Sequence, residues 1–179
     1  MNRQQIFLFL TLSIQIRIVP LSLLIHSMAC IFCDIVSGQL PSHKVWEDEN
    51  YLAFLSIFPN TLGTTVVIPK QHYPSYAFDL PEHILIDLLL TAKKVAKKID
   101  HAFTDVGRTG LVFEGFGVDH IHAKLFPMHG TKLDAWKAIN STLRTFYDVY
   151  PGYIASHDGE RMDDERLAET ARLIRESHP

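Results

Sequence analysis

One long amphipathic stretch, from Pro81 to Phe103, constrains the fold more than any other feature of this sequence. Its apolar residues recur every three or four positions and its lysines fall mostly outside that stripe, which predicts a helix with one buried face. Strands followed by a helix and then by more strands predict an α+β fold with a mainly antiparallel β-sheet. The runs that predict strands, rich in β-branched and aromatic residues, are 44–47, 51–56, 64–68, 109–113 and 118–126.

The composition is that of an ordinary globular protein. The chain has 179 residues, 47% of them hydrophobic, and a formal net charge of -3. This length suits roughly one domain. Because 17 basic residues are set against 20 acidic ones, no overall positive field exists to hold long nucleic acid. Two cysteines are too few for the disulfide framework of a small secreted domain.

Residues 1–27 form an apolar N-terminal extension that has more than one explanation. Arg3 precedes the apolar run 6–12, which resembles a weak signal peptide or a membrane-surface anchor. Polar residues and a proline between 15 and 20 interrupt the run before the roughly 20 apolar residues that a membrane-spanning helix needs. Domain-like sequence begins at Met28, so an over-extended start codon is the other explanation. We expect a non-native or signal-like extension that does not span a membrane.

The sequence changes character again after the last predicted strand. Residues 28–130 contain all the predicted strands and the long helix. Beyond them the chain becomes more polar, with helical character around Ala135 and Trp136 and again from 163 to 177. We therefore expect one domain at 28–130 and a helical C-terminal extension at 131–179.

An alternation of polar and apolar residues runs from Val118 to Pro127. On a strand this period of two places His120, His122 and Lys124 on one exposed face, with the intervening apolar side chains in the core. Neighbours on such a face lie roughly 6.6 Å apart, which suits contacts with successive phosphates or a metal ligand beside a nucleophile. A half-exposed strand with chance histidines is the alternative, but three basic groups in an apolar strand favour a function.

This segment resembles the signature of the histidine triad (HIT) family, in which three histidines alternate with apolar residues. The match runs from His120 to Phe126 and is followed by Pro127. The resemblance covers about residues 29–130 and implies a HIT-like α+β fold. Further segments agree with bacterial HIT proteins in the same order, namely Cys30–Ser42, Trp46–Glu49, Leu52–Leu55 and Val67–His72.

The resemblance also implies an activity. Family members are nucleotide hydrolases or transferases whose middle histidine attacks the α-phosphorus and forms a covalent nucleotidyl-histidine, which assigns the nucleophile to His122. They act on AMP-like phosphoramidates or dinucleoside polyphosphates and commonly form two-fold dimers that join their sheets. We therefore expect a cytoplasmic homodimeric enzyme with a small-molecule nucleotide substrate and with no nucleic-acid or membrane partner.

Several residues depart from the family pattern. Lys124 stands where the third histidine is usual, and a lysine, with a reference pKa of about 10.4, is a phosphate-binding point charge but a poor source of a shuttled proton. We expect Lys124 and His120 to contact the substrate phosphates. Ser56 stands where an Asp or Asn often contacts ribose, and Thr64 replaces a usual Gly-His. The alternative function is therefore a nucleotide-binding regulatory protein with weakened catalysis.

The spacing of Cys30 and Cys33 is compatible with a zinc site, a redox pair or an accidental pair of thiols. A closed structural zinc site needs four ligands. Some bacterial HIT proteins complete such a site with a histidine after the Ile-Pro-Lys strand and with the first histidine of the triad. His72 and His120 stand at those positions. The resemblance therefore implies a structural zinc bound by Cys30, Cys33, His72 and His120.

Overall fold

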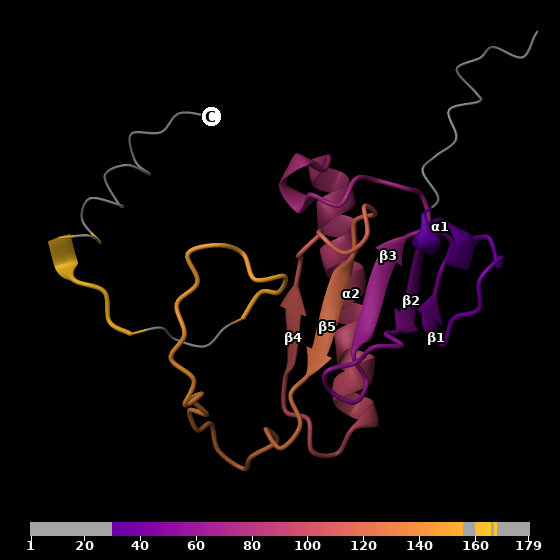
Figure 1. Cartoon of the computed structure of the whole chain (residues 1–179). Helices are drawn as coiled ribbons and strands as arrows, with labels where there is room; N and C mark the ends of the chain where they lie inside the picture. Colours follow the sequence, from indigo (N-terminus) through magenta and orange to yellow (C-terminus); the bar gives the residue numbers. More distant parts are fainter. Residues whose placement is uncertain (1–29, 156–159, 166, 168–179) are drawn as a thin grey trace, which may run out of the picture.

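A five-stranded antiparallel sheet with the strand order β1-β2-β3-β5-β4 forms the centre of the molecule (Figure 1). The structure, a computed structural model, describes residues 30–155, 160–165 and 167. Its antiparallel sheet and single long helix confirm the predicted α+β fold. The elements are α1 (Ile31–Val36), β1 (Lys44–Glu47), β2 (Tyr51–Leu55), β3 (Thr65–Pro69), the 3-10 turn η2 (Ala77–Asp79), α2 (Glu82–Ala102), β4 (Thr109–Val112) and β5 (Ala123–Pro127).

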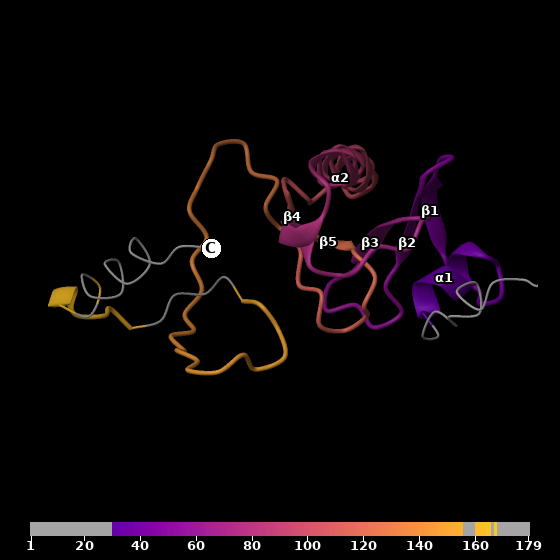
Figure 2. The ribbon, with the colours of Figure 1, turned by 90° about the horizontal axis from the view of Figure 1, so that it is seen from above.

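Helix α2 covers one face of the sheet. In the view from above it lies on one side of the strands, and α1 lies on the other side (Figure 2). The amphipathic stretch predicted between Pro81 and Phe103 is this helix, and its apolar stripe is buried as the pattern requires. That stripe and the sheet form one core cluster, which includes Leu88, Ala92, Val95, Ile99, Val67, Ala123 and Leu125.

Helix α1 lies on the opposite face of the sheet, where it buries the side chain of Phe32. The Phe32 ring meets the ring of Phe54 edge-on, with 5.6 Å between the centroids. Six residues are too few for a helix that is stable by itself, so packing on the sheet holds α1 in place. No pattern in the sequence predicted this helix. The core cluster on this face consists of Cys30, Phe32, Leu52, Phe54, Val66 and Ile68.

The histidine segment differs from its prediction in two respects. Strand β5 begins at Ala123, so His120 and His122 precede the strand on a bent connection. The intervening apolar residues do face the core. The two histidines are not exposed, however, since they retain only 0% and 3% of their accessible surface. The reason is α1, because the Phe32 ring lies edge-on against the rings of both histidines.

The segment after β5 also corrects the prediction. Residues 131–155 contain no helix, and this includes the stretch around Ala135 and Trp136. They run as extended and bent chain beyond the β4 edge of the sheet (Figure 1), and the Trp136 side chain is largely exposed. A short helix without tertiary packing is marginal in water, and the Trp136 and Ile139 side chains of this segment are 76% and 65% exposed. Further along, the amide of Leu167 donates to the carbonyl of Asp163 and closes a helical turn.

The remaining terminal predictions concern residues outside the described part of the chain. Residues 1–29, which include the extension and its boundary at Met28, are among them, as are 168–179. Within the described part, none of the helices is both long enough and apolar enough to cross a lipid bilayer.

Candidate functional site

Four potential metal ligands converge beside α1. Cys30 and Cys33 lie at the beginning of this helix, His72 follows β3 and His120 precedes β5. One ligand atom from each residue lies within 4.8 Å of those of the other three. Cys30 Sγ is 3.5 Å from His120 Nδ1, and Cys33 Sγ is 3.5 Å from His72 Nδ1. Two sulfur and two nitrogen donors around one point fit the donor chemistry of a structural zinc site.

Both ring nitrogens of His120 are directed by their neighbours. Nε2–H donates to the carbonyl of Pro69 over 2.9 Å, which leaves the Nδ1 lone pair facing Cys30 and Cys33. Burial lowers the pKa of His120 and favours the neutral imidazole that a metal ion requires. This orientation leaves no ring nitrogen for a phosphate. The geometry therefore does not support the phosphate contact that we expected of His120.

The cysteines of the cluster are both free thiols. Burial, reinforced by the hydrogen bond and charge of Cys30, raises the pKa of the Cys33 thiol to about 11. Reactive redox cysteines have a lowered pKa, so this environment is unlike that of a redox pair. Metal binding here must displace thiol protons, which makes affinity depend on pH.

His122 lies in the middle of the motif with its ring oriented by the backbone. Nδ1–H donates to the carbonyl of His120 over 2.7 Å. In the neutral imidazole the lone pair then belongs to Nε2. Burial is the largest influence on the pKa of His122 and lowers it, with a further lowering by the charge of Lys124. The neutral form, which is the nucleophilic one, is therefore favoured at neutral pH.

Lys124, the third basic residue of the motif, is held by an ion pair. Its Nζ lies 2.7 Å from Oε2 of Glu114, just beyond the end of β4. The other carboxylate oxygen, Oε1, accepts a hydrogen bond from the hydroxyl of Tyr150 in the segment 131–155. Burial by itself would raise the pKa of Glu114, but the hydrogen bonds from Lys124 and Tyr150 hold it below its usual range. The carboxylate is therefore ionised at neutral pH.

Sequence reasoning missed Glu114 and Tyr150. The pairing of β4 with β5 places Val112 opposite Lys124, and this register carries Glu114, two residues further on, toward the lysine. A carboxylate at the end of a predicted strand was the only signal in the sequence. It could not be used without the register, which depends on how the two strands meet.

A pocket of about 290 Å³ lies on the α1 face of the sheet. Its size is near the lower limit of small-molecule sites. His122 is not among the residues that line the pocket, but it precedes Lys124 by two residues, and the charges of Lys124 and Glu114 both act on its pKa. The lining includes Ser56 and Thr64, where the sequence departs from the family, together with Glu114, Lys124, Tyr153 and Ile154.

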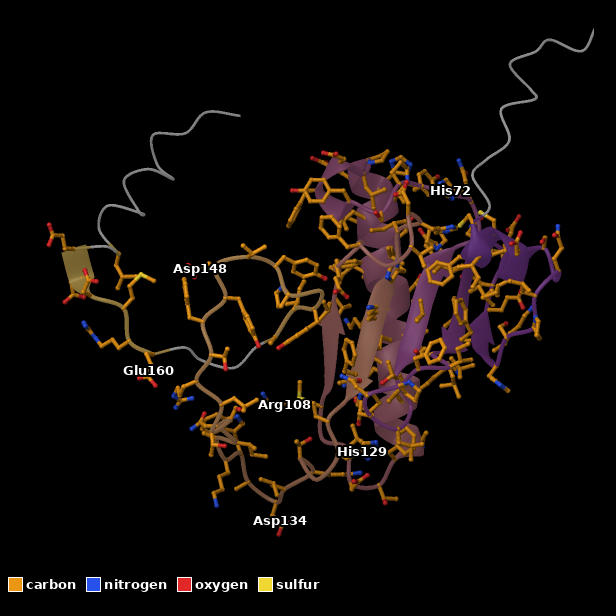
Figure 3. The ribbon with its side chains drawn as sticks, in the orientation of Figure 1. His72, Arg108, His129, Asp134, Asp148 and Glu160 are labelled. Carbon is orange, nitrogen blue, oxygen red and sulfur yellow. The ribbon has the colours of Figure 1, made fainter. Side chains whose placement is uncertain are left out.

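His129 is not part of this site. His72 marks the metal-ligand end of the sheet, and His129 lies at the opposite end (Figure 3). There its Nδ1 is 3.0 Å from a carboxylate oxygen of Asp105, and its Nε2–H donates to the carbonyl of Leu62 over 3.0 Å. Hydrogen bonds to both acceptors require a doubly protonated ring.

Comparison with known proteins agrees with this geometry. Residues 37–131 match the HIT domain. The chain is 36% identical over 117 residues to protein hit of Bacillus subtilis, covering 63% of this chain and 79% of that protein. It is 38% identical over 101 residues to an adenosine 5'-monophosphoramidase of Schizosaccharomyces pombe, covering 56% of this chain and 74% of that protein.

Solved structures give the same result. A HIT family protein from Bacillus anthracis superposes with a TM-score of 0.55 at 33% sequence identity, covering 85% of this chain and 99% of that chain. A zinc-bound histidine triad family protein from Mycobacterium smegmatis superposes with a TM-score of 0.52 at 28% identity, covering 64% of this chain and 85% of that chain. The domain match and these relatives show that the chain belongs to the HIT family.

Proposed function

We propose that this protein hydrolyses or transfers an AMP-like nucleoside monophosphate through a covalent intermediate on His122. The observation that carries the proposal is the orientation of that ring. Its Nδ1–H donates to a backbone carbonyl over 2.7 Å, so Nε2 carries the lone pair, and Lys124, two residues further along, lines the pocket. The family match and the named activity of the Schizosaccharomyces pombe relative support this substrate class.

The reaction has two displacements at phosphorus. In the first, His122 Nε2 attacks the α-phosphorus, the bond to the leaving group breaks, and the leaving group departs with its electron pair. In the second, a water oxygen or another acceptor attacks the same phosphorus and breaks the bond to Nε2. One water proton is released to solvent, and the products are the nucleoside monophosphate and neutral His122. Splitting one difficult displacement into two easier ones is the use of the covalent step.

Lys124 acts in this reaction as a cation that binds phosphate. An ammonium group stays charged at neutral pH and presents a compact point charge to a phosphate oxygen. Its Nζ is also 2.7 Å from Glu114, so the charge that a substrate meets is shared with a carboxylate. The lysine therefore binds the substrate and does not supply the proton for the leaving group.

A nucleotide-binding regulatory protein remains the second candidate. The observation that favours it is the same ion pair, because Lys124 replaces a titratable histidine and is already neutralised by Glu114. Such a protein would keep a saturable affinity for AMP while releasing no product from any AMP donor. Measuring both properties on one preparation separates the two candidates.

We propose that the cluster of Cys30, Cys33, His72 and His120 binds zinc. The support is the convergence of four suitable ligand atoms within 4.8 Å and the zinc-bound relative from Mycobacterium smegmatis. A zinc ion there would tie the N-terminal end of α1 to β3 and to the histidine segment, which is a structural contribution. The His120 carbonyl accepts from His122 Nδ1, so this tie would also hold the nucleophile in position.

The expected assembly is a homodimer. Strand β4 is an edge of the sheet in the described chain. Pairing of two such edges would join two sheets and cover the unpaired backbone groups. Light scattering of the purified protein tests this proposal. The two free thiols agree with the cytoplasm as the expected compartment, and cell fractionation tests that expectation.

The experiment that tests the function is a quench during turnover of a labelled AMP donor. We expect an acid-labile, base-stable phosphoramidate on His122 and release of AMP. A preparation that binds AMP but turns over neither an AMP phosphoramidate nor a dinucleoside polyphosphate would instead support the regulatory protein.

A further inference from the structure

Glu114 is the part of the pocket that neither the motif nor the proposed reaction uses. Its side chain retains only 12% of its accessible surface, and its carboxylate lies 2.7 Å from the Nζ of Lys124. Tyr150 donates to the other carboxylate oxygen and stacks at a tilt on Phe116, with ring centroids 5.4 Å apart. The hydrogen bond to Glu114 raises the pKa of Tyr150 to about 12, so its hydroxyl remains a donor at neutral pH. The carboxylate is thus fixed from two sides.

The charge of the pocket follows from this pair. Of the described residues that line it, Glu114 and Lys124 are the charged ones, and the others are apolar, hydroxyl or amide side chains. The two charges cancel at neutral pH. A pocket of this kind attracts no excess of negative charge, and a fixed carboxylate near the phosphates opposes every additional anionic group.

The two classes of AMP donor differ in that respect. In a phosphoramidate the bond that breaks joins phosphorus to nitrogen, and the nitrogen leaves as ammonia or an amine after it has taken a proton from solvent. In a dinucleoside polyphosphate the bond that breaks joins the α-phosphorus to a bridging oxygen, which leaves as part of a nucleoside polyphosphate with several negative charges. The second leaving group needs cations in the pocket, whereas the first does not.

We propose that Glu114 is a specificity-determining residue that makes the enzyme select AMP donors with an amine leaving group over those with a polyphosphate leaving group. This inference rests on the proposed function of His122. Tyr150 is a positioning residue in it, because its hydroxyl holds the carboxylate against Lys124. The C-terminal segment 131–155 therefore contributes to substrate choice although it contains none of the motif.

The test compares kcat/KM for adenosine 5'-phosphoramidate and for diadenosine tetraphosphate. The wild-type protein should prefer the phosphoramidate. Glu114→Gln keeps the size of the side chain and a hydrogen-bond acceptor for Tyr150 but releases the charge of Lys124. It should shift the ratio of the two kcat/KM values toward diadenosine tetraphosphate by about tenfold, and less at high ionic strength. Glu49→Gln removes an equal charge from an exposed turn and should leave the ratio unchanged.

Two further variants separate charge from packing. Glu114→Gln combined with Lys124→Met restores a neutral pocket, so its ratio should return toward that of the wild type even though both substrates bind less well. Tyr150→Phe leaves both charges in place and loosens the carboxylate, so it should give an intermediate ratio. Thermal unfolding of each variant measures any loss of fold.

A binding measurement keeps the inference independent of turnover. In a His122→Asn background, Glu114→Gln should tighten diadenosine tetraphosphate relative to AMP by a similar factor. If the wild-type protein turns over neither substrate, the proposed function fails while this measurement still decides the role of Glu114. The inference is overturned if Glu114→Gln changes neither ratio, or if Glu49→Gln changes them equally.

Discussion

The two faces of the sheet bury the same strands in different ways. On the α2 face the cluster is almost entirely apolar and includes Leu88 and Val95. On the α1 face the buried set includes His120 and His122, whose rings lie against Phe32. Within the described part of the chain, no buried side-chain nitrogen or oxygen lacks a hydrogen-bond partner. The α2 face is therefore held mainly by apolar packing, and the α1 face also by directed contacts of its buried histidines, which allows variants to separate stability from chemistry.

The strongest test of this separation is His122→Asn. The variant removes the nucleophile but keeps a donor for the carbonyl of His120, so turnover should fall by roughly three orders of magnitude or more while thermal unfolding changes little. Steady-state kinetics and circular dichroism measure the two effects. His83→Asn, on the exposed side of α2, is the matched control. A near-normal kcat, or a label that maps to another histidine, would sink the nucleophile assignment.

Metal removal should lower the stability of the protein by loosening the α1 face of the sheet. If zinc is bound by Cys30, Cys33, His72 and His120, elemental analysis should find one zinc per chain. The free energy of metal binding is also free energy of folding. A strong chelator should then lower Tm by about 10 °C or more. Cys33→Ser should lose the metal and some of that stability. Freshly purified, reduced protein that contains no zinc would contradict the prediction.

A variant on the α2 face should lower stability and leave turnover unchanged, which is the opposite of the effect of His122→Asn. Leu88→Ala removes a fully buried side chain and should lower the free energy of unfolding by about 2–5 kcal/mol. The kcat per folded molecule should stay unchanged, because no atom of the site is touched. Leu89→Ala, next along the helix but 49% exposed, should cost about 1 kcal/mol or less. Urea unfolding measures both, and a larger loss for Leu89 would show that this side of α2 is covered by another surface.

Lys124→Met tests the role of the cation that lines the pocket on the α1 face of the sheet. Removing the cation should weaken AMP binding by about tenfold, because a phosphate then faces Glu114 without a counter-charge. Lys124→His should retain or raise the turnover of substrates with poor leaving groups, since an imidazole can supply a proton. Calorimetric titration of AMP and steady-state kinetics measure these effects. An unchanged affinity of Lys124→Met for AMP would contradict the phosphate-binding role of Lys124.

The smallest expected effect lies at the far end of the sheet, at His129. The hydrogen bond to the Leu62 carbonyl and then the contact with Asp105 raise the pKa of His129. A histidine whose pKa is higher in the folded protein than in the unfolded chain contributes its full stabilisation below the unfolded pKa of about 6.5. It loses this contribution as the pH rises through the folded pKa. The Tm advantage of the wild type over His129→Gln should therefore shrink as pH rises from about 5.5 to 8.5. An advantage that stays constant with pH would mean that the contact acts without its charge.

Local periodicity accounts for what could be predicted. The stripe between Pro81 and Phe103 defined α2 almost to the residue, and the β-rich runs marked β1 to β4 to within about one residue of their ends. The fifth run, 118–126, begins five residues before β5. The pattern failed for α1, which is too short to show a period, and around Trp136, where the chain forms no helix and the Trp136 side chain is largely exposed.

The sequence by itself determined the helix, the strands and the apolar side of the histidine segment, because spacing along the chain encodes these features. The four candidate metal ligands came from the resemblance to the HIT family. Only the tertiary structure decided that His120 and His122 are buried beneath α1 and that Glu114 and Tyr150 meet at Lys124. Those contacts join residues far apart in the chain. Their geometry depends on the register of β4 against β5 and on the path of the segment after β5, and neither leaves a periodic trace in the sequence.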